Sequence, residues 1–114
     1  MISIIIPTRN EEKTIVEILK KLQDLRKAGH EIILSDGMST DRTRELAKPY
    51  VDRILEENDP GKRTIARGKN RGASFARGEY LLFLDADMVL PNPRSYIEKA
   101  LSYFKVNPKL VGLT

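Results

Sequence analysis

The sequence contains no cysteine, so disulfide bonds and thiolate-held metal ions are excluded, and a reducing, intracellular setting is favoured. Met1 leads directly into a strand pattern with no resemblance to a signal peptide. No apolar run approaches the roughly 20 residues that a membrane-spanning helix needs. The phosphate-binding loop GxxxxGK[S/T] and the dinucleotide pattern GxGxxG are both absent. The single histidine, His30, is interpreted as structural and exposed, so no Ser-His-Asp arrangement can be built.

Positive charge is in moderate excess. The chain has 114 residues, 32% of them charged and 40% apolar, with a formal net charge of +4 and a sequence pI of about 9.4. These values are typical of a soluble globular protein, and residues 1–114 are taken as a single domain. The basic excess has two interpretations. It forms either a solvated surface or a site for an anionic partner such as a nucleotide, a phosphate or a lipid head group.

Short apolar runs alternate with stretches of helical periodicity along the chain. Strands are predicted at residues 2–6, 31–34, 51–55 and 80–84, with a further strand beginning near 110. Helices are predicted up to Gly29, then at about 41–48, 60–76 and 94–105.

The boundaries of these elements carry local signals. Pro7 is expected to end the first strand. Thr8 has capping-box spacing to Glu11, and Asn10 is a competing cap for the same helix. Asp59 precedes a proline, which predicts the start of the third helix.

Strands that alternate with helices predict an α/β fold, with a Rossmann-like sheet of parallel βαβ units and helices covering both faces. In such sheets, ligands collect beyond the carboxyl ends of the strands. The predicted strands end in the polar segments Pro7-Thr8-Arg9-Asn10-Glu11, Ser35-Asp36-Gly37 and Asp85-Ala86-Asp87. We therefore expect a site along this edge of the sheet.

Asp85 and Asp87 follow the most apolar predicted strand and are one residue apart. Two neighbouring carboxylates repel each other unless a positive charge lies nearby. Hard oxygen ligands suit Mg²⁺ or Mn²⁺, and magnesium usually combines one or two carboxylates with water and substrate phosphates. The pair therefore predicts a metal ion that bridges the protein to a diphosphate. The alternative is a polar turn that leads to a helix cap at Asn92.

Two further polar features each have a functional and a structural interpretation. Asp36 is able to accept hydrogen bonds from a base or a ribose, or it shapes the turn that follows it together with Asp41. Arg63, Arg67 and Arg71 recur at helical spacing, so they face either the phosphates of a ligand or the solvent.

Four segments together resemble the donor-binding half of the family 2 glycosyltransferases, which have the GT-A fold. They are "SIIIPTRNEE" (3–12), "EIILSDGMSTDRT" (31–43), "ARGKNRGASFARGEY" (66–80) and "LLFLDADMVLPNP" (81–93). The resemblance implies metal-dependent transfer of a hexose from a nucleotide-diphosphate donor, with inversion. It also implies that the acceptor half and its general base lie beyond Thr114, so that catalytic residues cannot be named.

The resemblance assigns roles to individual residues. Pro7, Thr8, Asn10 and Glu11 would line the nucleoside pocket, with Glu11 on the ribose side. Asp36 would read the base, while Asn70 and Gly72 would pack against the nucleotide with help from Arg67. Asp85 and Asp87 would hold Mg²⁺ or Mn²⁺ against the diphosphate next to Ala86.

The chain departs from the family pattern in places that affect specificity. Ser35-Asp36 stands where many members have two acids, and Met38 stands where glycine or serine is usual. The sequence therefore does not decide whether the nucleotide of the donor is UDP or GDP. A protein, a lipid phosphate and a polysaccharide all stay open as acceptors, and no nucleic acid is expected.

The resemblance and the composition also suggest a location and partners. We expect a cytoplasmic protein, free or attached to the cytoplasmic face of a membrane. A truncated sheet has an open edge, which makes homo-oligomerisation a reasonable hypothesis.

Two rival functions are kept. "LLFLDADMVL" also fits the haloacid-dehalogenase phosphatases, in which Asp85 would be the nucleophile and Asp87 the acid and base. The other rival is a nucleotide-binding or assembly module without turnover.

Overall fold

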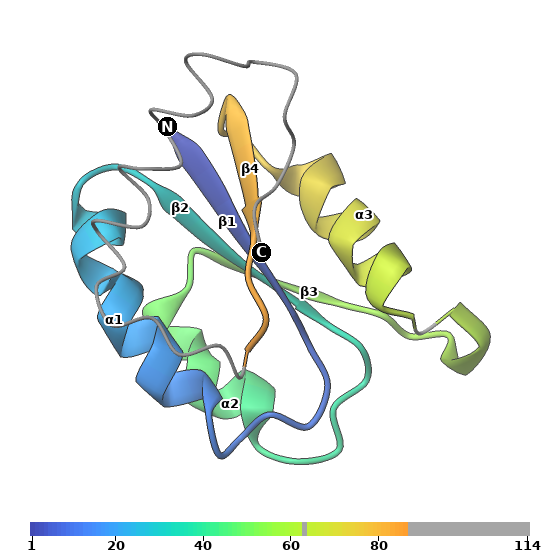
Figure 1. Ribbon diagram of the computed structural model, residues 1–114. Helices are drawn as coiled ribbons and strands as arrows, with labels where there is room; N and C mark the ends of the chain where they lie inside the picture. The colour runs from blue at the N-terminus through green and yellow to red at the C-terminus, as the bar shows by residue number, and fades with distance from the viewer. Residues whose placement is uncertain (63, 87–114) are drawn as a thin grey trace.

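The computed structural model describes residues 1–62 and 64–86. Its centre is a four-stranded parallel sheet with the order β3-β2-β1-β4 (Figure 1). The strands are β1 (Ile2–Thr8), β2 (Glu31–Asp36), β3 (Arg53–Glu56) and β4 (Tyr80–Phe83). The predicted α/β class is confirmed, and each predicted strand within the described residues is present.

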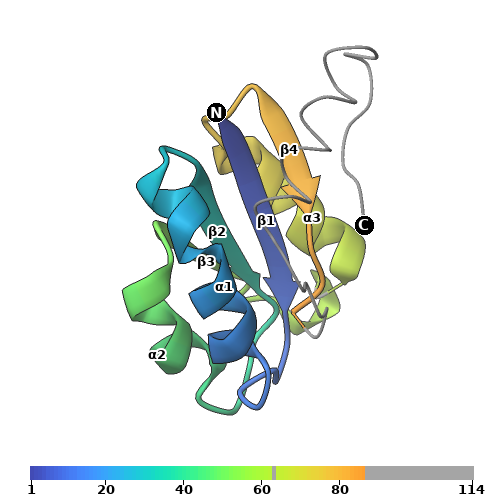
Figure 2. The ribbon, with the colours of Figure 1, turned by 60° about the vertical axis from the view of Figure 1, so that its left-hand side comes forward.

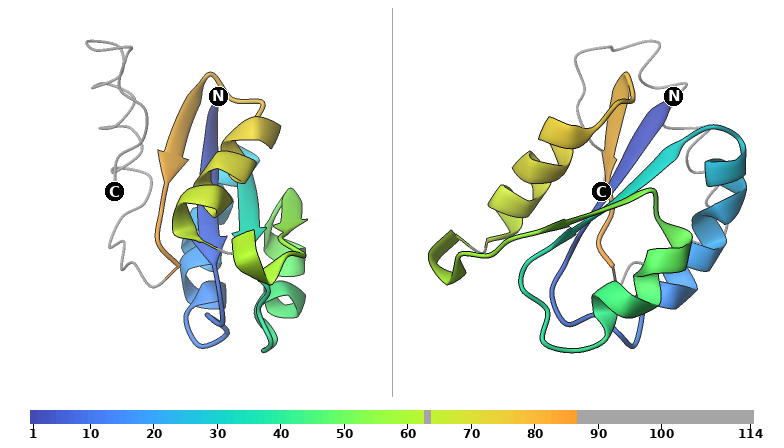
Figure 3. Two further views of the ribbon diagram at one scale, coloured as in Figure 1. Left: turned by 90° about the vertical axis from the view of Figure 1, so that its right-hand side faces the viewer. Right: turned by 180° about the vertical axis from the view of Figure 1, so that it is seen from behind.

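The helices lie on both faces of this sheet, as predicted. They are α1 (Ile15–Lys27), α2 (Thr43–Ala47) and α3 (Ile65–Phe75), with short 3₁₀ turns η1 (Lys48–Tyr50) and η2 (Pro60–Lys62). Figures 2 and 3 show α1 and α2 together on one side of the sheet and α3 on the other.

Alternation along the strands decides which helix each side chain meets. Ile4 and Ile6 are fully buried in a cluster with Leu19 and Leu22 of α1. Ile5, on the opposite face, packs against α3, where a Cβ placed on Gly72 would lie 2.3 Å from Ile5 Cγ2. Both faces of β1 are therefore covered, which explains why this strand has almost no polar residues.

The first strand continues through Pro7 to Thr8, so the prediction that Pro7 ends it is wrong. Ile5 O accepts a hydrogen bond from Leu84 N on the β4 side, and Thr8 O accepts one from Gly37 N on the β2 side. Pro7 has the parity of Ile5, so its missing N–H faces the β4 side. There the pairing has already ended, at Ile5 with Phe83, and the strand loses no hydrogen bond.

Two of the predicted helix starts are also wrong. α1 begins only after Thr14, and neither Thr8 nor Asn10 caps it. The third helix begins after Thr64, whose hydroxyl oxygen accepts from Arg67 N at 3.1 Å. A helical turn does begin at Pro60, but it is the short 3₁₀ turn η2, in which Asp59 accepts from Gly61 N, and not the start of α3. The expected end of α1 is confirmed, because Gly29 has the left-handed φ of 102° that stops a helix.

The amino ends of the strands are joined by a polar network. Ser3 Oγ donates to Glu31 Oε1 at 2.5 Å, and it accepts from Gly78 N at 2.7 Å. Arg77 N donates to the same Glu31 oxygen. These bonds fasten the segment between α3 and β4 onto β1 and β2.

The predicted helix at 94–105, its cap at Asn92, and the strand near 110 lie outside the described residues. None of the helices within residues 1–62 and 64–86 has the length and apolar composition that crossing a bilayer requires.

His30 gives a testable dependence of stability on pH. Its Nδ1 accepts a hydrogen bond from Ile2 N at 3.0 Å, which requires an unprotonated nitrogen. The ring is half-buried rather than exposed as predicted. Burial, and then the positive amino terminus, lower the pKa of His30 below its ordinary value of 6.5. A lowered pKa means that the unfolded chain binds the proton first, so stability is complete above pH 6.5 and falls as the pH drops below it.

We therefore expect the melting temperature to fall between pH 7.5 and 5.5 by more in the wild type than in His30→Gln, which keeps an acceptor but does not titrate. Melting curves followed by circular dichroism measure this. Parallel falls in the two proteins would contradict the assignment.

Candidate functional site

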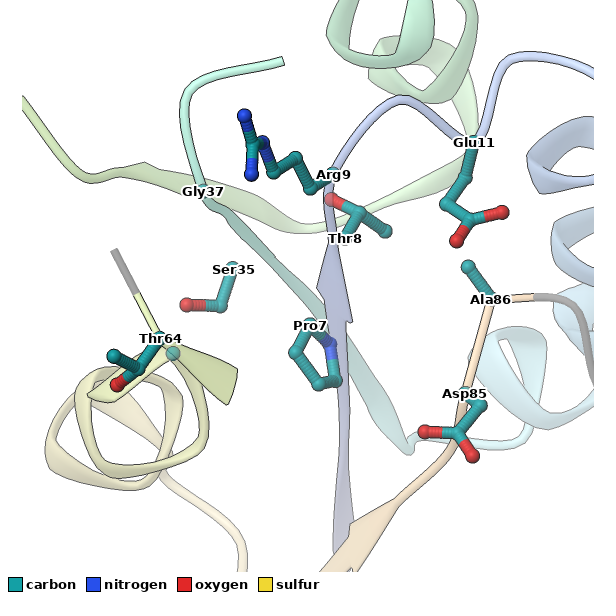
Figure 4. Close-up of a pocket in the computed structure, with 10 residues that line it drawn as sticks. Pro7, Thr8, Arg9, Glu11, Ser35, Gly37, Thr64, Asp85 and Ala86 are labelled. Carbon is teal, nitrogen blue, oxygen red and sulfur yellow. The ribbon is translucent and has the colours of Figure 1, made fainter. Parts of the chain in front are cut away.

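An open pocket of about 490 Å³ lies where the carboxyl ends of β1, β2 and β4 meet the start of α3 (Figure 4). This is the sheet edge at which parallel α/β proteins bind their ligands. The pocket is lined by Pro7, Thr8, Arg9, Glu11, Ser35, Gly37, Thr64, Gly68, Asp85 and Ala86.

The pocket brings together some of the expected site residues and leaves others aside. Those that line it are Pro7, Thr8, Glu11, Asp85 and Ala86. Those that are described but do not line it are Asn10, Asp36, Arg67, Asn70 and Gly72. Asp87, the second expected metal ligand, lies outside the described residues.

Asp36 lies beneath the pocket, and its side chain is 0% exposed. Thr8 Oγ1 and Ser39 Oγ donate to its Oδ1, at 3.0 and 2.6 Å, while Ser39 N donates to its Oδ2 at 2.9 Å. Arg44 Nε lies 3.7 Å from Oδ2. Its carboxylate is thus used to join the ends of β1 and β2, and base reading by Asp36 stays a prediction.

Asn10 joins two loops rather than facing the pocket. It has a φ of 55°, and its Oδ1 accepts from Thr40 N at 2.7 Å. Its backbone N donates to Ser39 Oγ at 2.9 Å. Met38 in the same turn has a φ of 63°. This left-handed conformation explains why glycine suits the position that Met38 occupies.

The arginine stripe of α3 points at Glu57, just after β3. Arg71 Nη2 lies 2.7 Å and Arg67 Nε 3.9 Å from Glu57 Oε2. The hydrogen bond from Asp59 N, together with the charges of these two arginines, lowers the pKa of Glu57. The described part of the stripe therefore meets a protein carboxylate, and Arg63 lies outside the described residues.

Asp85 is exposed at the end of the segment that follows β4, and it lines the pocket. Within the described residues it has no hydrogen bond or ion pair. Glu11, the other pocket acid, accepts from Thr14 Oγ1 at 3.3 Å.

No cluster of three or more metal-ligating side chains occurs in residues 1–62 and 64–86. A single free carboxylate with Asp87 two residues on still fits Mg²⁺ or Mn²⁺, which complete their shells with water and phosphate oxygens.

Sequence reasoning placed Arg9, Ser35 and Gly37 in the polar segments at this edge without giving them a role, and it missed Thr64 and Gly68 as pocket residues. Ser35 could have been found by alternation, because it points to the face opposite Leu34 and Asp36. Thr64 could have been found as the cap of α3. Gly68 brings the helix close, since a Cβ there would lie 3.5 Å from both Pro7 Cβ and Ser35 Oγ.

A parallel sheet covered on both faces, with a polar pocket beyond its strand ends, defines an α/β domain of the ligand-binding type. The family model described as "Glycosyl transferase family 2" matches residues 3–113, so the chain belongs to this family. The resemblance stated from the four segments is confirmed. Family membership replaces the phosphatase interpretation of residues 81–90.

The chain is similar to curated members of the family. It is 36% identical over 93 residues to poly(ribitol-phosphate) beta-N-acetylglucosaminyltransferase TarS of Staphylococcus aureus, covering 75% of this chain and 16% of that protein. It is 34% identical over 120 residues to a dolichyl N-acetyl-alpha-D-glucosaminyl phosphate 3-beta-D-2,3-diacetamido-2,3-dideoxy-beta-D-glucuronosyltransferase of Methanococcus voltae, covering 98% of this chain and 37% of that protein.

Solved structures share the fold. The mannosyltransferase PcManGT from Pyrobaculum calidifontis, in complex with GDP-Man and Mn²⁺, has a TM-score of 0.78 and 28% identity, covering 90% of this chain and 32% of that one. TarS 1–349 of S. aureus in complex with UDP-GlcNAc has a TM-score of 0.74 and 30% identity, covering 91% and 31%. The fold is therefore that of the GT-A glycosyltransferases, and the chain spans about a third of these structures.

Proposed function

We propose that the pocket binds a nucleotide-diphosphate sugar together with a divalent cation, and that the protein transfers the sugar to an acceptor with inversion. Family membership supports the reaction class. The ligands of the solved neighbours, UDP-GlcNAc in one and GDP-Man with Mn²⁺ in another, support the substrate class. The pocket volume of about 490 Å³ lies within the usual range for small-molecule sites.

The observation that carries the proposal is the carboxylate of Asp85, which lines the pocket and has no partner among the residues that the structure describes. Asp85, with Asp87 after it, would hold Mg²⁺ or Mn²⁺ against the diphosphate. The cation would supply Lewis-acid stabilisation of the charge that develops on the departing nucleoside diphosphate. Pro7 and Thr8 form the wall against which the nucleoside lies, and Glu11 accepts hydrogen bonds from the ribose. The acceptor, the general base, and association with a membrane or a second copy stay predictions.

The test is nucleotide binding in the presence and absence of metal. We expect UDP or GDP to bind with Mn²⁺ and to lose affinity when EDTA is added. Asp85→Asn is expected to weaken metal-dependent binding at least about tenfold, since losing even an outer-shell partner of a metal site typically costs that much. Asp24→Asn is the matched control, because Asp24 is an exposed acid of α1 that does not line the pocket. Isothermal titration calorimetry measures both.

Unchanged metal-dependent binding in Asp85→Asn would overturn the proposed cation site. A second measurement distinguishes the transferase from a binding module without turnover. It follows the release of free sugar from UDP- and GDP-sugars in the presence of Mn²⁺. Slow, metal-dependent release supports the transferase, whereas tight binding without release or transfer supports the module.

A further inference from the structure

Arg9 is a cationic residue of the pocket lining whose side chain has no hydrogen bond or ion pair with the other described residues. It is exposed and directly follows β1. Figure 4 shows its guanidinium extending toward Gly37 at the end of β2, on the side of the pocket away from Asp85. An arginine in a pocket without a protein partner has its five donors available to a ligand.

The neighbouring arginines are committed to protein acids. Arg44 lies 3.7 Å from Asp36 and 3.2 Å from Glu56. Arg67 and Arg71 both meet Glu57. Arg9 therefore differs from the other described arginines at this edge of the sheet.

These ion pairs also occupy the carboxylates of the protein on this side of the pocket. Asp36, Glu56 and Glu57 each face an arginine, and Asp36 is buried. The other polar groups that line the pocket on the side of β2 and α3 are the hydroxyls of Ser35 and Thr64 and the backbone at Gly37 (Figure 4). This end of the pocket consequently offers a guanidinium fork, with no free carboxylate among the described residues to bind the N–H groups of a base.

Nucleobases differ in how well they match such a fork. Guanine presents two adjacent acceptors, O6 and N7, which a guanidinium binds bidentately. Adenine presents N7 beside a donor amino group, and uracil presents O4 without an adjacent acceptor. A good bidentate contact discriminates against the wrong base by about fivefold to more than a hundredfold.

We propose that Arg9 selects a guanine-nucleotide donor over a uridine-nucleotide donor by donating to O6 and N7 of the base. The inference rests on the proposed function, because the diphosphate at Asp85 leaves the opposite end of the pocket for the base. It goes beyond that function by naming the base and the residue that reads it.

The experiment compares GDP, UDP and 7-deaza-GDP, which lacks the N7 acceptor, by calorimetry with Mn²⁺. We expect the wild type to bind GDP at least about fivefold more tightly than UDP, with 7-deaza-GDP weaker than GDP. Arg9→Ala is expected to bring GDP close to UDP, to leave UDP within about twofold, and to abolish the effect of the N7 deletion. Arg9→Lys keeps the charge without the fork, so it is expected to lose most of the preference for GDP.

Arg42→Ala is the matched control, because it removes the same charge from an exposed residue that does not line the pocket. Equal weakening of GDP and UDP in Arg9→Ala, with recovery in Arg9→Lys, would show that Arg9 binds phosphate, and would overturn the inference. Equal wild-type affinity for GDP and UDP overturns the inference alone. Absence of binding to either nucleotide overturns the proposed function as well.

Discussion

Gly72→Ala is expected to lower the free energy of unfolding by about 2 kcal/mol. The added Cβ would lie 2.3 Å from Cγ2 of Ile5, a fully buried side chain of the central strand. Forcing an extra methyl group into a packed core usually costs about 1–3 kcal/mol, and this contact is at the severe end of that range. Removing a glycine from a helix interior returns about 1 kcal/mol, which offsets only part of the cost.

Gly68→Ala is the matched control in the same helix. A Cβ there would lie 3.5 Å from Pro7 Cβ and Ser35 Oγ, which is ordinary van der Waals contact. The gain in helix propensity is the same, so this variant is expected to be more stable than the wild type by up to about 1 kcal/mol. Urea unfolding followed by circular dichroism measures both variants. Equal stability of the two variants would mean that α3 does not pack against β1 as described.

Asp36→Ala is expected to destabilise the protein by about 3 kcal/mol, whether or not a nucleotide is present. The substitution leaves the buried Ser39 N, and the hydroxyls of Thr8 and Ser39, without their acceptor. It also removes a fully buried partner of Arg44. Breaking a buried, hydrogen-bonded ion pair typically costs about 3–5 kcal/mol, and the partial exposure of Arg44 places this case at the lower end.

Glu56→Ala provides the comparison, because Glu56 shares Arg44 with Asp36 but has a side chain that is 49% exposed. An exposed ion pair contributes roughly 0–1 kcal/mol, so this variant should unfold close to the wild type. The alternative role of Asp36 makes the opposite prediction. If Asp36 reads the base, Asp36→Ala would keep most of its stability and lose nucleotide affinity instead.

The strands β1, β2 and β4 were predictable because each contains a short apolar run bounded by polar or turn residues, whereas β3 has only Ile54 and Leu55 between two charged residues. The helix starts were not predictable from local signals alone. Thr8 and Glu11 have the spacing of a capping box, but the Thr8 hydroxyl donates to Asp36, 28 positions away. The side chain of Asn10 is likewise taken by the backbone of Thr40. Long-range bonds of this kind leave no signature in a window of a few residues.

The site was partly predictable for a related reason. The sequence located the polar edge of the sheet, and Asp85 and Glu11 do line its pocket. Deciding between the adjacent residues Ser35 and Asp36 required the alternation of β2 to be followed to its last residue. That alternation sends Asp36 to the α1 face, below the pocket. Arg9 was passed over because its availability depends on which acids the other arginines occupy, which is a property of the fold.

The central position of β1 has a consequence for synthesis of the chain. β1 is synthesised before the other three described strands, but one of its edges pairs with β4, and Ser3 also accepts from Gly78 across 75 positions. At a translation rate of about 5–20 residues per second, this edge of β1 stays unpaired for roughly 4–15 s until β4 is synthesised. During this interval an isoleucine-rich strand has an unpaired backbone edge, which is a template for pairing with another chain.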